Sequence, residues 1–480
     1  MTDPEDVRPG AVLRILARAV LALAFAACGD HAPPPLARRV ILITCDTLRA
    51  DRLGCYGYER PTSPNLDRFA REAVVFDNAW STAPKTTPAI SALLTGRPPD
   101  ELGVTGGNRY LLPPAALTLA EEACAAGLRT GAVISNWVLR AQPQYGGAGV
   151  EQGFEHFDDQ MELRETSRDD VYERLAPATT DAAIGWLEER RARGEDAFFF
   201  WVHYQDPHGP YRPPAEVLAR FERPATEEPE LPLGTTQRGF GQIPAYQAID
   251  VERRPEPYRA RYDAEIAYFD EHLGRLLDWL ARADWMRDAL VVFTADHGES
   301  LGEQGYWFCH GESLHAELVR VPLLVRFPDG VAHVRVDERR RVARAAGHLD
   351  LWPTILEAFG SEPTRCRGLS LFGAELPEQR FLLQALGRRE HDRWLAFGDG
   401  RWRLVARSGE KPRLYDGAGD PRETLDVAAQ HPEVVRELRR LLEEDQAAFP
   451  IEALAEQPIA KDPETERHLG ALGYAEGDEN

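Results

Sequence analysis

Short runs of β-branched and aliphatic residues alternate with longer amphipathic stretches over most of this chain. Apolar runs occupy residues 38–44, 128–135 and 198–204, and a further run, ALVVFTA, ends at residue 295. Uninterrupted runs of this length are typical of strands buried on both faces of a parallel sheet. Because helix signals fill the stretches between them, the pattern predicts an α/β fold with a doubly wound, mixed but mostly parallel sheet.

Helix start and stop signals frame the stretches between the strands. Ser63 followed by Pro64 predicts a helix N-terminus. Gly194 is expected to end the helix that contains TTDAAIGWLEERRARG. In YDAEIAYFDEHLGRLLDWLARADW, apolar residues recur at helical intervals from Ile266 to Leu280, which predicts a long amphipathic helix directly before ALVVFTA.

Two stretches depart from this alternation. Residues 223 to about 258 are rich in Pro, Gly and Glu, which predicts a long insertion near the site that governs substrate selectivity. After residue 390, RWLAFGDGRWRLVARS predicts a hairpin and PEVVRELRRLLEEDQAAF an amphipathic helix. The expected organisation is a large domain over residues 38–390, followed by a small α+β subdomain and tail over residues 391–480.

Composition agrees with a large folded enzyme. The chain has 480 residues, of which 43% are hydrophobic and 28% charged, so it can bury a substantial core. Its 78 acidic and 56 basic residues give a net charge of −22. This charge argues against tracking of a phosphate backbone, so no nucleic-acid partner is expected.

The first residues resemble an export signal. Arg8, Arg14 and Arg18 precede AVLALAFAA, which is too short to span a bilayer but has the size of a secretory apolar region. Small residues and Cys28 follow, and the whole resembles a bacterial lipoprotein signal in which Cys28 becomes lipidated. Residues 1–37 are therefore interpreted as signal and linker, although a plain cleaved signal or a short anchor remains an alternative. We expect an exported, envelope-located protein that faces the periplasm and meets the membrane only through this segment.

The cysteines do not predict a disulfide framework. They form no CxxC pair, and if Cys28 is lipidated an odd number remains, so at most one or two bridges are expected. The other cysteines are Cys45, Cys55, Cys124, Cys309 and Cys366.

Two apolar runs end in acidic residues. VILIT is followed by Cys45 and Asp46, and ALVVFTA is followed by Asp296 and His297. Parallel strands present such residues at the carboxyl edge of the sheet, where open α/β folds place their ligands. Although about 250 positions separate the two runs, they predict a shared metal site.

The stretch KTTPAISALLTGRPP adds a possible nucleophile. Pro88 suits the first turn of a helix that runs to Thr95, with Gly96 just beyond its end. Thr86 and Thr87 then lie at the positive helix end, where an anion is favoured by about 0.3–1 kcal/mol at an exposed site. A hydroxyl at this place can act as a nucleophile. The alternative is an ordinary threonine helix cap.

With these motifs in place, the chain resembles the sulfatase family of the alkaline-phosphatase superfamily. The matching blocks include DTLRADRLGCYGY, TTPAISALLTGRPP, HYQDPHGPYRPP, ADHGESLGEQGYWFCHGESLHAELVRVPLLVRF and the closing LYDGAGDPRETL. They cover nearly everything from residue 38 to the end. The resemblance implies an alkaline-phosphatase-like fold, a sulfatase-like catalytic domain and hydrolysis of sulfate or phosphate esters.

The resemblance also implies roles for single residues. Asp46, Asp296 and His297 would bind one divalent metal ion. Thr86 stands at the position of the family's nucleophile, where its oxygen would be a further ligand. Two histidines match those that contact the transferred group or protonate the leaving group, namely His208 and His310. Arg49 and Lys85 are weaker candidates for substrate binding, with a salt bridge and a solvated charge as their respective alternative roles. Asn136 is a further weak candidate, which could reach the substrate from the end of its strand.

Departures from the arylsulfatase pattern affect the expected chemistry. Arylsulfatases carry a formylglycine made from Cys or Ser, and Thr86 cannot be converted to it. Cys45 replaces an acidic ligand, and His297 replaces an Asn. A threonine nucleophile with an Asp-His pair resembles phosphoethanolamine transferases and lipoteichoic acid synthases instead. A phosphoryl-group transferase acting on an envelope substrate and an inactive sulfatase-like binding protein are therefore alternatives to a hydrolase.

The ligand types suggest the cofactor and the substrate. Two carboxylates and a hydroxyl form a hard-oxygen site, and the imidazole favours Zn or Mn, with Ca or Mg possible. The cation would activate the threonine oxygen towards an anionic ester. Because water must then cleave the covalent intermediate at phosphorus or sulfur, phosphate mono- or diesters are favoured over sulfate esters.

Overall fold

The computed structural model describes residues 34–104, 110–141, 149–161, 173–224, 227–236, 238–362, 366–373, 376–377, 382–386, 393–399, 401–450, 454–455 and 457–458. The chain divides into two compact units, Met1–Pro34 and Pro35–Asn480, and the elements below belong to the second. Cys28 and most of the expected signal segment lie outside the described residues, as does the tail after residue 458.

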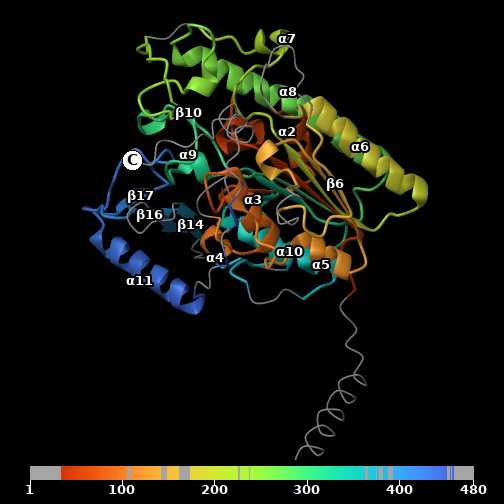
Figure 1. The fold of residues 1–480 in the computed structure, drawn as a ribbon. Coiled ribbons are helices and arrows are strands. Elements are labelled where there is room, and N and C mark those ends of the chain that lie inside the picture. The colour runs from red at the N-terminus through yellow and green to blue at the C-terminus, as the bar shows by residue number, and fades with distance from the viewer. Residues whose placement is uncertain are drawn as a thin grey trace, which may run out of the picture. The chain divides into compact units, whose positions relative to one another are not determined.

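A mixed sheet forms the centre of the Pro35–Asn480 unit (Figure 1). Among the described residues its strand order is β12-β2-β11-β8-β1-β7-β5-β6. Its strands are β1 (Arg39–Cys45), β2 (Val74–Phe76), β5 (Arg129–Ile134), β6 (His156–Asp158), β7 (Phe198–Tyr204), β8 (Ala289–Ala295), β11 (Leu323–Arg326) and β12 (Arg341–Val342). β1 pairs in parallel with both β7 and β8, whereas β11 runs antiparallel to β8. The predicted apolar runs thus form the central strands, and β1, β7 and β8 are buried throughout.

Helices cover both faces of the sheet. On one side lie α3 (Thr86–Thr95), α5 (Leu119–Ala125) and α10 (His348–Phe359), and on the other lie α2 (Pro64–Ala70), α6 (Ala176–Arg193) and α8 (Pro255–Arg282), as Figure 1 shows. The predicted doubly wound arrangement is therefore confirmed. The short elements are β3 (Ala79–Trp80), α4 (Pro99–Leu102), β4 (Tyr110–Leu111), α7 (Ala215–Leu218), β9 (Ser300–Leu301), β10 (Trp307–Cys309), α9 (Ala316–Val319), β13 (Ala346–Gly347) and β18 (Gln457–Pro458).

The N-terminus of α2 is capped by a different group from the one that the sequence predicts. Ser63 occupies the N-cap position as predicted, but its hydroxyl makes no cap hydrogen bond and donates to Asp67 instead. The backbone N–H groups of Asn65 and Leu66 donate to the Asp270 carboxylate of α8, at 2.9 and 2.8 Å. A carboxylate from a distant helix therefore replaces the local cap.

A small antiparallel sheet lies near the C-terminus, made of β14 (Leu382–Leu386), β15 (Trp394–Gly398), β16 (Trp402–Arg407) and β17 (Arg413–Asp416). It contains the predicted hairpin, and its first strand precedes residue 391. Alternate residues of β16 and β17 face opposite ways. Leu404 and Leu414 pack with Leu438 of α11 (Pro432–Ala448), while Val405 and Tyr415 join a cluster with residues from the central part of the chain.

No disulfide links any of the five described cysteines. None of the helices in the described part of the chain combines the length and apolar composition needed to cross a bilayer.

Two helix-ending glycines provide a test of the packing. Gly96 and Gly194 have left-handed φ values of 66° and 68°. A Cβ on Gly96 would lie 2.4 Å from Trp352 Cγ, whereas one on Gly194 would meet nothing within 4 Å. We expect Gly194→Ala to cost about 1 kcal/mol of unfolding free energy and Gly96→Ala about 1–3 kcal/mol more, because of overpacking. Urea unfolding of both variants measures the difference, and equal losses would contradict this account of the contact.

Candidate metal centre and active site

Neighbouring strands bring the candidate residues to one edge of the sheet. Asp46 directly follows β1, and Asp296 directly follows β8 beside it. Asn136 lies just after β5, and His208 lies just after β7. Because these four strands are parallel and adjacent, their carboxyl ends meet, which is how residues far apart in the chain come together.

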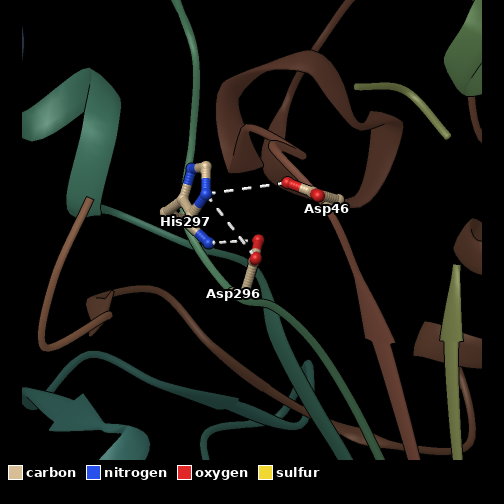
Figure 2. Close-up of side chains that lie close together, drawn as sticks. All are labelled: Asp46, Asp296 and His297. Atoms are coloured by element: carbon tan, nitrogen blue, oxygen red, sulfur yellow. Dashed lines mark hydrogen bonds and ion pairs between the residues drawn. The ribbon is translucent and has the colours of Figure 1, made fainter. Parts of the chain in front are cut away.

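Asp46, Asp296 and His297 form a compact buried group, shown in Figure 2. All three side chains are fully buried, and their ligand atoms lie within 4.8 Å of one another. The Nε2 atom of His297 is 3.6 Å from Asp46 Oδ1 and 3.6 Å from Asp296 Oδ2. Two ligands about 2.1 Å from a tetrahedral metal ion are roughly 3.4 Å apart, so these separations fit one cation.

The hydrogen bonding of the group also fits a cation. Asp46 Oδ1 and Asp296 Oδ2, the carboxylate oxygens that lie 3.6 Å from His297 Nε2, make no hydrogen bond within the described structure. His297 Nδ1 lies 2.9 Å from the carbonyl oxygen of Gly298. Because a carbonyl only accepts, Nδ1 carries the proton and the lone pair of a neutral His297 is on Nε2. Two bare oxygens and one nitrogen lone pair thus converge as metal ligands do.

Without a cation, this arrangement of buried ionisable groups is electrostatically unfavourable. Burial, with the Asp296 carboxylate nearby, raises the pKa of Asp46 well above its usual value, and burial raises the pKa of Asp296 to about 8. Burial and the neighbouring His310 ring lower the pKa of His297 well below its ordinary value. Two ionised carboxylates beside a neutral imidazole lack a positive counter-charge, and a divalent ion supplies one.

Thr86, at the start of α3, faces Asp46, Asp296 and His297, which are called the metal group below. Its Oγ1 lies 3.5 Å from Asp46 Oδ2 and 3.4 Å from His297 Nε2. The N-cap of α3 is Lys85, with Thr86 as the first helical residue. The threonine is therefore not the ordinary helix cap that the sequence allowed, and its hydroxyl is directed to the metal group.

Two further histidines surround the group. The His310 ring centroid lies 4.6 Å from that of His297 and 5.2 Å from that of His208. His208 Nδ1 donates to the carbonyl of Gly209 at 2.6 Å, which leaves its Nε2 able to accept a proton. Burial, together with the Lys85 ammonium, lowers the pKa of His310 to about 3. Both predicted histidines therefore lie beside the metal group.

The weaker candidates occupy different places. Asn136 donates from its amide to Asp46 Oδ2 and accepts from Val138 N, so it orients a metal-group carboxylate. Lys85 is partly exposed and its side chain packs over Gly311, next to His310.

Arg49 points to a neighbouring cavity. Its guanidinium pairs with Asp51 at 2.7 Å and Glu303 at 2.9 Å, and donates to the backbone oxygen of Glu299 at 3.0 Å. It lines a cavity of about 940 Å³ with Arg52 and other arginines. Arg49 thus holds the backbone of Glu299, which lies two residues after His297 of the metal group.

Sequence reasoning missed the carboxylate that holds His310. Glu299 is fully buried, and its Oε1 lies 3.1 Å from His310 Nδ1. Its other oxygen accepts from the Tyr211 hydroxyl at 2.9 Å. The available signals were weak, since Glu299 only closes the DHGE sequence and Tyr211 follows His208 by three positions in HGPY.

The described part of the insertion reaches this site. The Tyr246 ring lies 6.4 Å from that of His208, centroid to centroid. Gln247 is buried, and its side-chain oxygen accepts from Tyr211 N at 3.3 Å. The insertion between β7 and α8 therefore forms part of the surroundings of the histidines.

Comparisons with known proteins match this geometry. A family model described as Sulfatase matches residues 38–361. An N-acetylglucosamine-6-O-sulfatase of Bacteroides thetaiotaomicron is 24% identical over an alignment of 534 residues, covering 89% of this chain and 90% of that protein. The phosphonate monoester hydrolase of Agrobacterium radiobacter has a TM-score of 0.68 at 20% identity and covers 90% of this chain and 100% of its own. A protein solved with its substrate D-glucosamine-2-N,6-O-disulfate has a TM-score of 0.66 at 21% identity, with 86% and 98% covered. The expected alkaline-phosphatase-like α/β fold is confirmed.

Removal of one carboxylate tests the metal centre. We expect wild-type protein to hold one divalent ion per chain and Asp296→Asn to hold far less, measured by elemental analysis. When EDTA removes the metal, we expect the wild type to be the less stable of the two proteins. Asp296→Asn should then have an unfolding free energy about 1–3 kcal/mol higher than that of the wild type, because the amide, unlike the buried Asp296 carboxyl, does not have to take up a proton when the protein folds at neutral pH. Wild type that lacks metal, or a variant that keeps it, would contradict the assignment.

Proposed function

Because this chain belongs to the sulfatase family, we propose that its metal centre hydrolyses anionic esters with Thr86 as the nucleophile. One observation carries the proposal. The Thr86 hydroxyl lies within 3.5 Å of both Asp46 and His297, next to buried carboxylate oxygens that lack hydrogen bonds. A nucleophile, a ligand set and two more histidines thus converge, as an ester hydrolase requires.

The centre suits one divalent ion, held by Asp46, Asp296, His297 and the Thr86 oxygen. Zn²⁺ or Mn²⁺ is favoured because the set mixes carboxylate oxygens with an imidazole nitrogen, while Ca²⁺ or Mg²⁺ fits the oxygens alone. When bound, the ion lowers the pKa of the threonine hydroxyl and withdraws charge from a substrate oxygen.

The residues then divide the reaction between them. The Thr86 hydroxyl gives its proton to His208 or His310 as Oγ1 bonds to phosphorus, and that histidine passes the proton to the departing alkoxide as the ester bond breaks. Water next attacks phosphorus and gives a proton to the same histidine. The bond between Thr86 and phosphorus breaks, the histidine returns the proton to the Thr86 oxygen, and the phosphate product leaves. Asn136 keeps the Asp46 carboxylate in position, and Glu299 orients His310.

The preference for phosphate esters rests on Thr86. Formylglycine can release sulfate by elimination from its hydrated aldehyde, whereas a threonine ester must be cleaved by water at the central atom. We therefore place phosphate mono- and diesters first and sulfate esters second. The names of the relatives point to both chemistries, since one is an N-acetylglucosamine-6-O-sulfatase and another structure is a phosphonate monoester hydrolase.

A second candidate is phosphoryl transfer to an envelope acceptor. It is favoured by the pairing of Thr86 with an Asp-His ligand set and by the expected lipid anchor at Cys28. In that case an acceptor hydroxyl replaces water in the second step. An inactive binding protein is disfavoured because the hydroxyl of Thr86 reaches the metal group.

Substitution of the nucleophile tests the proposal. We expect Thr86→Ala to lower kcat by about 10³-fold or more on p-nitrophenyl phosphate, bis-p-nitrophenyl phosphate or p-nitrophenyl sulfate, because no other oxygen attacks from that position. The matched control is Thr87→Ala, one residue along the same helix, which should stay within about tenfold. Metal content should be retained in both variants, since both aspartates and His297 remain.

The same substrate panel separates the alternatives. Faster turnover of the sulfate than of either phosphate would overturn the proposed preference but not the nucleophile. Full activity in Thr86→Ala would overturn the nucleophile. Product formation that requires an added acceptor alcohol would favour the transferase, and no turnover by metal-loaded wild type on any substrate would favour the binding protein.

A further inference from the structure

The loop that follows His310 is held by the C-terminal part of the chain. The His310 loop, residues 310–315, leads directly into α9. The backbone N–H of Ala316 donates to Glu423 Oε2 at 3.0 Å. Glu423 belongs to LYDGAGDPRETL, the closing motif, which the proposed chemistry does not use. A carboxylate more than one hundred positions along the chain thus fixes the end of an active-site loop.

Arg403 completes this contact. Its guanidinium lies 2.6 and 2.8 Å from the two Glu423 oxygens and donates to the backbone oxygen of Leu314. His315 Nδ1 lies 3.5 Å from Glu423 Oε2. Glu423 and Arg403 are only 4% and 3% exposed, so solvent screens their ion pair little. Together, Glu423 and Arg403 contact three successive residues, Leu314 to Ala316.

Glu423 is held in an uncommon state. Its φ is 53°, in the left-handed region that side chains other than glycine rarely adopt. Burial opposes ionisation, yet the Arg403 guanidinium keeps the pKa of Glu423 below its usual value. A strained backbone and a buried charge persist only where surrounding contacts maintain them, and such residues often lie at functional sites.

A second set of hydrogen bonds connects the closing motif to His310. The Gln304 amide donates to the backbone oxygens of Arg422 and Glu423, each at 3.3 Å. Tyr306, two residues after Gln304, donates from its hydroxyl to the backbone oxygen of His310 at 2.7 Å. The closing motif therefore contacts both segments that flank the strand leading to His310.

We propose that Glu423 is a positioning residue for His310, acting through Arg403 and residues Leu314–Ala316, so that the C-terminal sheet completes the active site. The inference rests on the proposed function, in which His310 contacts the transferred group or the leaving group. Glu423 itself touches no substrate. A shift of about 1 Å in such a group lowers the rate by about 10²-fold, because alignment is lost.

The first test uses Glu423→Gln, which keeps the size of the side chain and removes its charge, and Glu423→Gly, which also relaxes the φ of 53°. On the best substrate of the panel, we expect both to lower kcat by about 10- to 100-fold and to change KM by less than about threefold. If only the backbone of Glu423 mattered, Glu423→Gly would retain activity, and that result would overturn the proposal.

Two controls separate positioning from general destabilisation. Leu414→Ala weakens the face of the C-terminal sheet that packs on α11, away from the His310 loop. It should lower Tm at least as much as Glu423→Gln and leave kcat within about twofold. Glu410→Gln breaks an exposed ion pair with Arg407 in the same sheet and should be neutral. An equal loss of kcat in Leu414→Ala would overturn the proposal.

A double-mutant cycle identifies the partner. If Glu423 acts by placing His310, then His310→Ala combined with Glu423→Gln should be no slower than His310→Ala alone, within about twofold. Additive losses would instead mean that Glu423 acts on another part of the protein, contrary to the proposal.

Hydrogen exchange provides a readout that needs no turnover. In metal-loaded protein, we expect Glu423→Gln to speed exchange of the amides of residues 313–317 by at least about tenfold, because the Ala316 N–H loses its charged acceptor. Leu414→Ala should leave these amides unchanged. Unchanged exchange in Glu423→Gln overturns the positioning role whether or not the enzyme turns over the panel, whereas faster exchange without any activity leaves the positioning intact and rejects the proposed function.

Discussion

Two carboxylates buried side by side, with a neutral imidazole as their neighbour, are the constraint on which the rest of the structure depends. Asp46 and Asp296 lie at the ends of adjacent strands and are fully buried. The carboxylate oxygen of each that lies nearest His297 Nε2 has no hydrogen-bond donor in the described structure. Such a group is unfavourable unless a cation neutralises it. The fold must therefore supply enough burial elsewhere to hold these residues close, and the central strands β1, β7 and β8, which are buried throughout, do so.

The surroundings of the group follow from this constraint. Asn136 and the backbone N–H groups of Thr47 and His297 occupy the remaining oxygens of the two aspartates. The Gly298 carbonyl sets the tautomer of His297. Each contact fixes the direction of a ligand without adding positive charge. The positive end of α3 and the three histidines then face the same space, which concentrates anion-binding capacity where Thr86 lies.

Much of the fold was predictable because it depends on local patterns. The apolar runs of β1, β7 and β8 specify buried strands, and the residue after each strand lies at the carboxyl edge whatever the remaining structure is. The metal-group residues followed from that rule. Contacts between distant segments leave no local pattern, which is why Glu299 under His310, Asp270 at the start of α2 and the Glu423 contact were not predicted.

The order of synthesis differs from the order of strands in the sheet. β1 is made early, yet its two neighbours are β7 and β8, and the register joins Arg39 to both Phe198 and Ala289. A nascent chain that has not yet reached Ala295 leaves one long edge of β1 unpaired, and this edge is a hazard for association with other chains. Folding of the domain therefore waits until more than half of the polypeptide has been made.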